Sequence, residues 1–74
     1  MNIIEKIKIY ADSITESNNK TLFHSDKGFR ISSPNVNGVF KDIILDDDKL
    51  LFFSDTPFAR VIFKKEWNSI EIIK

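Results

Sequence analysis

The chain has 74 residues, with eleven acidic side chains balanced by eleven basic ones, one histidine and no cysteine. This length predicts a single domain over residues 1–74. Without cysteine, neither a disulfide nor a thiolate-bound metal can stabilise so small a core, so stability must come from packing or from association with another chain. The zero formal charge also lacks the basic excess that is usual in general nucleic-acid binders.

Membrane insertion and secretion are not indicated. No apolar run approaches the roughly 18 residues of a membrane-spanning helix, and the first residues begin an amphipathic pattern rather than a signal peptide. We therefore expect a cytoplasmic protein that contacts no membrane.

Residues 2–17 have the spacing of one amphipathic helix. Ile3, Ile7 and Ile14 belong to its apolar stripe, and most polar side chains fall on the other side. The residues after position 16 are poor helix formers that favour caps and turns, so the helix is expected to stop there.

After Asn19 the chain changes to short runs rich in β-branched and aromatic residues, separated by turn residues. The turn over 25–28 ends in Gly28 and predicts a hairpin between the first two runs. The predicted strands are residues 21–24, 29–32, 39–45, 50–54, 58–64 and 69–73. The fold class is therefore α+β: one N-terminal amphipathic helix followed by an antiparallel sheet of about six short strands, with the helix on one face.

The central hairpin organises the chain. Two apolar runs flank Asp46, Asp47, Asp48 and Lys49, which cannot lie unpaired in a core and must turn into water. Residues 39–45 and 50–54 are thus expected to pair antiparallel, with residues 46–49 as an exposed tip.

The central strands are apolar on both faces, as in the run from Leu50 to Phe53. An antiparallel sheet with one wet face should alternate instead. Either the sheet curls and encloses both faces, or a second molecule covers one of them. From the second alternative we predict a homodimer or higher oligomer.

Catalytic and metal chemistry are not indicated. His24 has no second histidine or cysteine beside it, and we expect an ordinary strand histidine. The consecutive carboxylates at 46–48 lack the spacing of a calcium loop. We expect a non-enzymatic protein with no cofactor and no metal.

Charge is unevenly distributed. Residues 42–55 contain five aspartates and one lysine, for a local charge of −4. These aspartates are candidate partner-binding residues: Asp42, Asp46, Asp47, Asp48 and Asp55. A basic segment follows, with Arg60, Lys64 and Lys65; these cations either contact phosphates, face solvent, or pair with the acidic tip.

Trp67 lies in a predicted turn over residues 65–68. Either it folds back on the core, or it anchors an interface, since tryptophan is enriched among binding hot spots.

Two five-residue stretches, 19–23 and 48–52, end in Leu-Phe three positions after a polar residue. They are similar to the short peptide by which bacterial proteins dock on the DNA sliding clamp, in which Gln precedes two variable residues, Leu or Met, and Phe. Asn19 and Asp48 stand in place of that Gln. Leu51 and Phe52 are therefore further candidate partner-binding residues.

The whole chain resembles the small early proteins that phages of Gram-positive bacteria direct against host replication, and in particular phage-encoded inhibitors of the sliding clamp. The resemblance rests on length, the Asn-, Ile- and Lys-rich composition, the lack of cysteine and the acidic hairpin tip. It implies a protein of the host cytoplasm that fills the basic DNA channel of the clamp with carboxylates and blocks replication.

Two other classes of function stay open. One is an oligomeric structural or regulatory interaction module. The other is a nucleic-acid-binding protein that uses Arg60, Lys64 and Lys65. Of these classes we expect the first, a protein that binds a basic DNA-handling host protein and does not contact nucleic acid directly.

Overall fold

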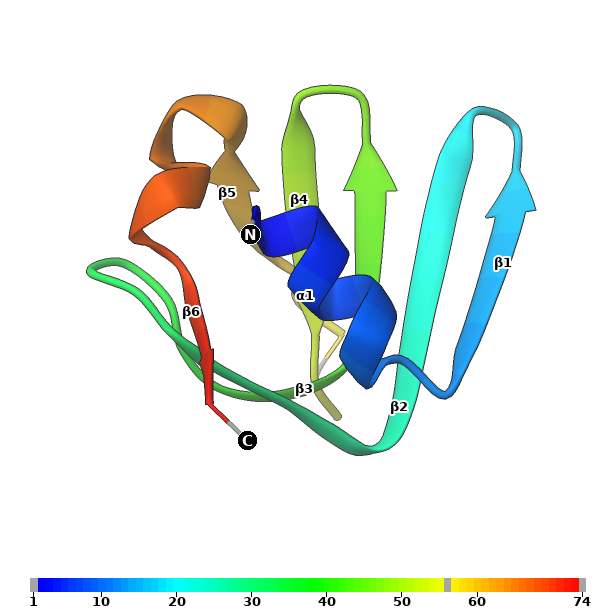
Figure 1. The fold of residues 1–74 in the computed structure, drawn as a ribbon, viewed down its shortest axis with the longest axis horizontal. Helices are drawn as coiled ribbons and strands as arrows, with labels where there is room; N and C mark the ends of the chain where they lie inside the picture. Colours follow the sequence, from blue (N-terminus) through cyan, green and yellow to red (C-terminus); the bar gives the residue numbers. More distant parts are fainter. Residues whose placement is uncertain (1, 56, 74) are drawn as a thin grey trace.

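The computed structural model describes residues 2–55 and 57–73. One short helix is followed by six antiparallel strands, which confirms the α+β class (Figure 1). The elements in chain order are α1 (Ile3–Tyr10), β1 (Ser13–Ser17), β2 (Lys20–Ser32), β3 (Asn37–Asp46), β4 (Lys49–Phe53), β5 (Arg60–Phe63), the 3₁₀ helix η1 (Lys64–Ser69) and β6 (Glu71–Ile73).

Helix α1 begins where the sequence predicts it and ends earlier. The side chain of Asn2 caps it by accepting a hydrogen bond from the backbone N–H of Glu5 at 2.9 Å. Ile3 and Ile7 are buried, and the last helical residue is Tyr10. The apolar stripe that packs on the sheet is thus only two turns long.

The predicted continuation of the helix over residues 13–17 is wrong, because this segment is strand β1. Asn18 and Asn19 have positive φ angles of 51° and 65°, and they form a two-residue turn that pairs β1 with β2. Two consecutive residues of this conformation suit a tight hairpin. The asparagines therefore start a hairpin rather than ending a helix.

The predicted hairpin turn over residues 25–28 is also wrong, because β2 continues through it. The pairing of β2 with β3 shifts between His24↔Asp42 and Phe29↔Phe40. Four residues of β2 thus face one residue of β3 in this interval, and β2 bends strongly here (Figure 1). A glycine turn signal of this kind fits a large bulge as well as a hairpin.

The bend lets the two halves of β2 pair with different strands. Strands β1 to β5 follow one another as a meander, and β6 returns to pair with β2. The first half of β2 pairs with β1 and its second half with β6, both on the edge opposite β3. The sheet therefore curves around the core, and α1 covers the concave face (Figure 1).

The predicted pairing of the two central strands is confirmed, but Asp46 and Lys49 belong to the ladder and are half-buried, so the exposed tip is shorter than the predicted residues 46–49. β3 and β4 pair antiparallel, with Ile43 opposite Phe52 and Asp46 opposite Lys49. The last strands are shorter than predicted: β5 and β6 lie within the ranges 58–64 and 69–73, and η1 occupies the predicted turn.

The core lies between the inner face of the sheet and α1. The rings of Phe40 and Phe52 approach to 5.5 Å between centroids. The buried apolar residues are Ile3, Ile7, Phe23, Phe29, Ile31, Val36, Phe40, Ile43, Leu50, Phe52, Ile62 and Ile70.

Gly28 is required by the bulge for two reasons. Its φ angle is +90°, and a Cβ placed on it would lie 2.4 Å from Cγ1 of Val39. We predict that Gly28→Ala lowers the free energy of unfolding by about 2 kcal/mol in urea denaturation. Val39→Ala, at a half-exposed side chain, should cost little alone and restore part of the loss in the double variant. A Gly28→Ala protein as stable as the wild type would contradict this role of the bulge.

Candidate partner-binding surface

The tip of the β3–β4 hairpin carries the three consecutive aspartates. Asp46 forms the last pair of the ladder with Lys49, and both side chains are half-buried. Asp47, with a φ angle of 55°, and Asp48 form the two-residue turn and are exposed. Two of the predicted tip carboxylates therefore face water freely, whereas Asp46 lies on the sheet surface.

Cations surround this tip. The Nζ atom of Lys20 lies 3.7 Å from Oδ2 of Asp46. The backbone N–H of Lys64 donates to the carbonyl oxygen of Asp48 at 2.7 Å, and both residues line a shallow hollow with Lys65. The basic segment thus folds beside the acidic one, which is one of the arrangements that the sequence leaves open. The tip is a surface of mixed charge.

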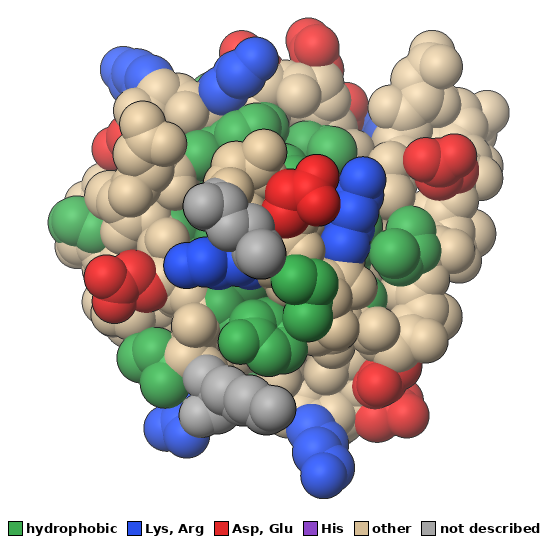
Figure 2. All heavy atoms as spheres, in the orientation of Figure 1, with side chains coloured by type: hydrophobic (Ala, Val, Ile, Leu, Met, Phe, Trp, Pro, Cys, Tyr) green, Lys and Arg blue, Asp and Glu red, His purple; other side chains and the backbone are tan. Residues whose placement is uncertain are grey.

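The other two candidate aspartates lie away from the tip. Asp42 is four residues before Asp46 on β3, roughly 13 Å along the strand, and Asp55 follows the opposite end of β4. The five carboxylates therefore do not form one patch. The face that carries α1 likewise shows both signs of charge scattered among apolar side chains (Figure 2).

A row of apolar side chains crosses the outer face of the sheet, away from α1. The strand registers place Leu22, Ile44, Leu51 and Val61 directly beside one another on β2 to β5. Leu22 is 36% and Val61 43% exposed, and the two between them are half-buried. We call these four residues the outer row. The two apolar faces of the central strands thus differ in their surroundings: the inner face forms the core, and the outer row meets solvent in the monomer.

Charged and aromatic residues border the outer row. On the side of the hairpin tip lie Lys20, Asp46, Lys49 and Phe63, which are neighbours across β2 to β5. On the other side lie His24, Asp42 and Phe53.

The two clamp-like peptide stretches are parts of β2 and of the β3–β4 hairpin. Their phenylalanines, Phe23 and Phe52, are fully buried. The preceding leucines, Leu22 and Leu51, belong to the outer row. A Leu-Phe pair of alternating strand residues cannot present both side chains to one partner, so neither stretch can dock as a peptide while the sheet is intact.

Trp67 lies on η1 and packs against the core, half-buried. Its Nε1–H donates to the carbonyl oxygen of Ile62 at 3.2 Å. The ring therefore attaches η1 to β5, which is the core-packing alternative for this residue.

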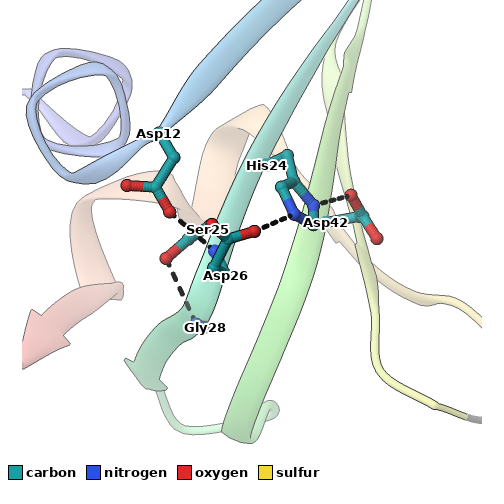
Figure 3. A network of polar contacts seen from close by, with 6 residues as sticks. All are labelled: Asp12, His24, Ser25, Asp26, Gly28 and Asp42. Atoms are coloured by element: carbon teal, nitrogen blue, oxygen red, sulfur yellow. Dashed lines mark hydrogen bonds and ion pairs between the residues drawn. The ribbon is translucent and has the colours of Figure 1, made fainter.

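His24 is the residue whose surroundings the sequence does not predict. Its Nδ1 lies 2.8 Å from Oδ1 of Asp42, and its Nε2 lies 2.9 Å from Oδ1 of Asp26 (Figure 3). The hydrogen bonds to Asp42 and then to Asp26 raise the pKa of the imidazole above its ordinary value of 6.5. Within residues 2–55 and 57–73, no group of three or more histidine, aspartate or glutamate side chains is arranged to hold a metal ion.

Comparison of the chain with known protein families, curated proteins and solved structures returned no match. None of the described helices has the length and apolar character needed to cross a membrane.

Because side chains alternate between the two faces of β2 and β4, substitutions at neighbouring residues should change the free energy of unfolding by very different amounts. Phe52→Ala and Phe23→Ala should each lower the free energy of unfolding by about 3–5 kcal/mol, because each leaves a cavity in the core. Leu51→Ala should cost only about 1 kcal/mol, since its side chain meets solvent. Urea denaturation measures both, and equal losses at positions 51 and 52 would contradict the assignment of the two faces.

Proposed function

We propose that this chain is a non-enzymatic protein that binds a basic DNA-handling protein and keeps it from engaging DNA. The sliding clamp is the best candidate partner, as the resemblance to phage-encoded clamp inhibitors implies. The observation that carries the proposal is the exposed pair of carboxylates, Asp47 and Asp48, at the end of a hairpin whose strands pair without interruption up to Asp46 and Lys49.

The contacts of the candidate aspartates favour two of them, Asp47 and Asp48, for partner binding. Asp46 already faces Lys20 and Lys49, and Asp42 already contacts His24. Asp47 and Asp48 are the exposed tip carboxylates, so they can contact a lysine or arginine of a partner. We therefore assign the electrostatic contact to these two residues, with the nearby lysines reducing its strength.

Calorimetry with a purified clamp tests this assignment. Replacing Asp47 and Asp48 together by Asn should weaken binding by about 2 kcal/mol if their charge pairs become desolvated, and binding should fall as salt concentration rises. Asp55→Asn is the control at the far end of the hairpin, and it should leave the affinity nearly unchanged.

Two results would overturn the proposal. If the wild type shows no binding to the clamp, the clamp is not the partner. If Asp55→Asn weakens binding as much per charge as the tip substitutions, the effect comes from overall charge and not from the hairpin tip.

A second function, self-association, is favoured by the outer row. We propose that a second copy of the chain covers this face in a two-fold dimer. An axis parallel to the strands and between β3 and β4 would lay β3 over the partner's β4. Leu51 would then face the partner's Ile44, and Asp46 would face the partner's Lys49, so apolar and charged rows are both self-complementary.

The size of the face sets the expected strength of the dimer. Four strands about 4.8 Å apart and three rows about 7 Å apart cover roughly 400 Å² on each copy. A standard stable interface takes about 800 Å² from each partner. We therefore expect a weak dimer that forms at tens of micromolar and dissociates on dilution.

Sedimentation velocity on matched variants tests the dimer. Leu51→Lys places a charge at the centre of the outer row and should give a monomer at concentrations where the wild type is dimeric. Ile9→Lys introduces the same charge on α1, where Ile9 is 63% exposed, and should leave the dimer intact. A monomeric wild type at tens of micromolar, or a dimer that persists in Leu51→Lys, would contradict the assignment.

A further inference from the structure

The bulge of β2 is held by side chains in place of a continuous strand ladder. The backbone N–H of Asp26 donates to Oδ2 of Asp12 at 2.7 Å, and the N–H of Gly28 donates to Oγ of Ser25 at 3.1 Å (Figure 3). The N–H of Asp12 in turn donates to the carbonyl oxygen of His24 at 2.7 Å. The first two bonds involve residues of the interval where β2 changes register against β3, and the third holds His24 at the start of that interval.

His24 joins this bulge to β3. Its two ring nitrogens each face a carboxylate oxygen, from Asp26 on the bulge and from Asp42 on β3. An ionised carboxylate only accepts hydrogen bonds, so both contacts are satisfied only when both ring nitrogens carry a proton. The neutral imidazole has one donor, and its other nitrogen would face a carboxylate lone pair.

The charged groups around the imidazole come from three elements. Asp42 lies on β3, Asp26 on the bulge of β2, and Asp12 on the link between α1 and β1, where its carboxylate accepts from the backbone of Asp26. Ser13 of β1 lies opposite His24. A groove of about 500 Å³ runs beside the bulge, between Tyr10 and the end of β6, and Lys27 and Arg30 line it together with Asp12 and Asp26.

We propose that His24, with Asp26 and Asp42, is a proton-dependent latch that fixes the bend of β2. When the imidazolium loses its proton, one of its two contacts is lost, and the bulge and the adjoining groove loosen. The latch borders the outer row and lies at the end of the hairpin opposite the Asp47–Asp48 turn. It is independent of the proposed binding partner.

The direction of the pH effect follows from linkage. The folded-state pKa of His24 is raised above 6.5. The latch therefore stabilises the fold fully below the ordinary histidine pKa, and this contribution is lost as pH rises through the raised value. The bend should loosen on the alkaline side of that transition, while the paired strands away from it remain intact.

NMR of the single histidine tests the latch without ambiguity of assignment. We expect the His24 ring signals of the wild type to titrate with a midpoint above 6.5, and the midpoint to fall in Asp42→Asn and Asp26→Asn. Asp55→Asn removes the same charge at a site outside the latch and should leave the midpoint unchanged. A wild-type midpoint at or below 6.5, or a midpoint insensitive to both latch substitutions, would overturn the proposal.

Amide hydrogen exchange provides the structural readout. The N–H groups of Asp26 and Gly28 should exchange faster, relative to the intrinsic rate, once pH exceeds the His24 midpoint, whereas the N–H of Ile43 should stay protected. In His24→Gln this pH step should disappear, because the amide does not titrate in that range. Protection at Asp26 and Gly28 that stays constant through the His24 midpoint would show that the proton does not hold the bend.

Discussion

The bulge at residues 25–28 is the constraint on which the rest of the fold depends. It gives β2 three more residues than β3 between the pairs His24↔Asp42 and Phe29↔Phe40. An odd number of extra residues reverses the inside–outside alternation, so Phe40 and Ile43 both point into the core although they are three residues apart on β3. The bend also leaves the outer edge of β2 free for β1 at one end and β6 at the other.

The curvature of the sheet also determines which surfaces stay exposed and can contact a partner. The inner face is buried by the curl of the sheet and by α1, whereas the outer row stays half-exposed. The hairpin tip ends in Asp47 and Asp48, but Lys20, Lys49, Lys64 and Lys65 lie close to it. The outer face therefore combines an apolar centre with mixed charge at its edge.

Local sequence signals predicted the parts of the fold that depend on local physics. The central hairpin was predictable because two β-rich runs flank a tetrapeptide that cannot be buried. The start of α1 was predictable from its apolar spacing. Its end was not, because Ile14 continues the helical stripe by position although it lies on β1 and is 47% exposed. The turn at Asn18 and Asn19 makes residues 13–17 the first strand of a hairpin rather than the end of a helix.

Other features depend on contacts between distant residues. Gly28 fits a hairpin turn and a bulge equally well in a single sequence, and the pairing of β2 with β3 on both sides of residues 25–28 distinguishes them. The environment of His24 includes Asp42, 18 residues away, so its spacing gave no sign of a paired histidine. The position of Lys64 beside Asp48 likewise follows from the pairing of β5 with β4, which places basic residues next to the acidic tip.

We propose that the folded chain binds its partner through the hairpin tip, at the edge of the outer row. Amide NMR spectra of the labelled protein, recorded as unlabelled clamp is added, test it most directly. We predict that the signals of Asp47, Asp48 and their neighbours on β3 and β4 shift or broaden first, while those of α1 and β6 change little. Changes confined to α1 and β6, or none at saturating clamp, would contradict it.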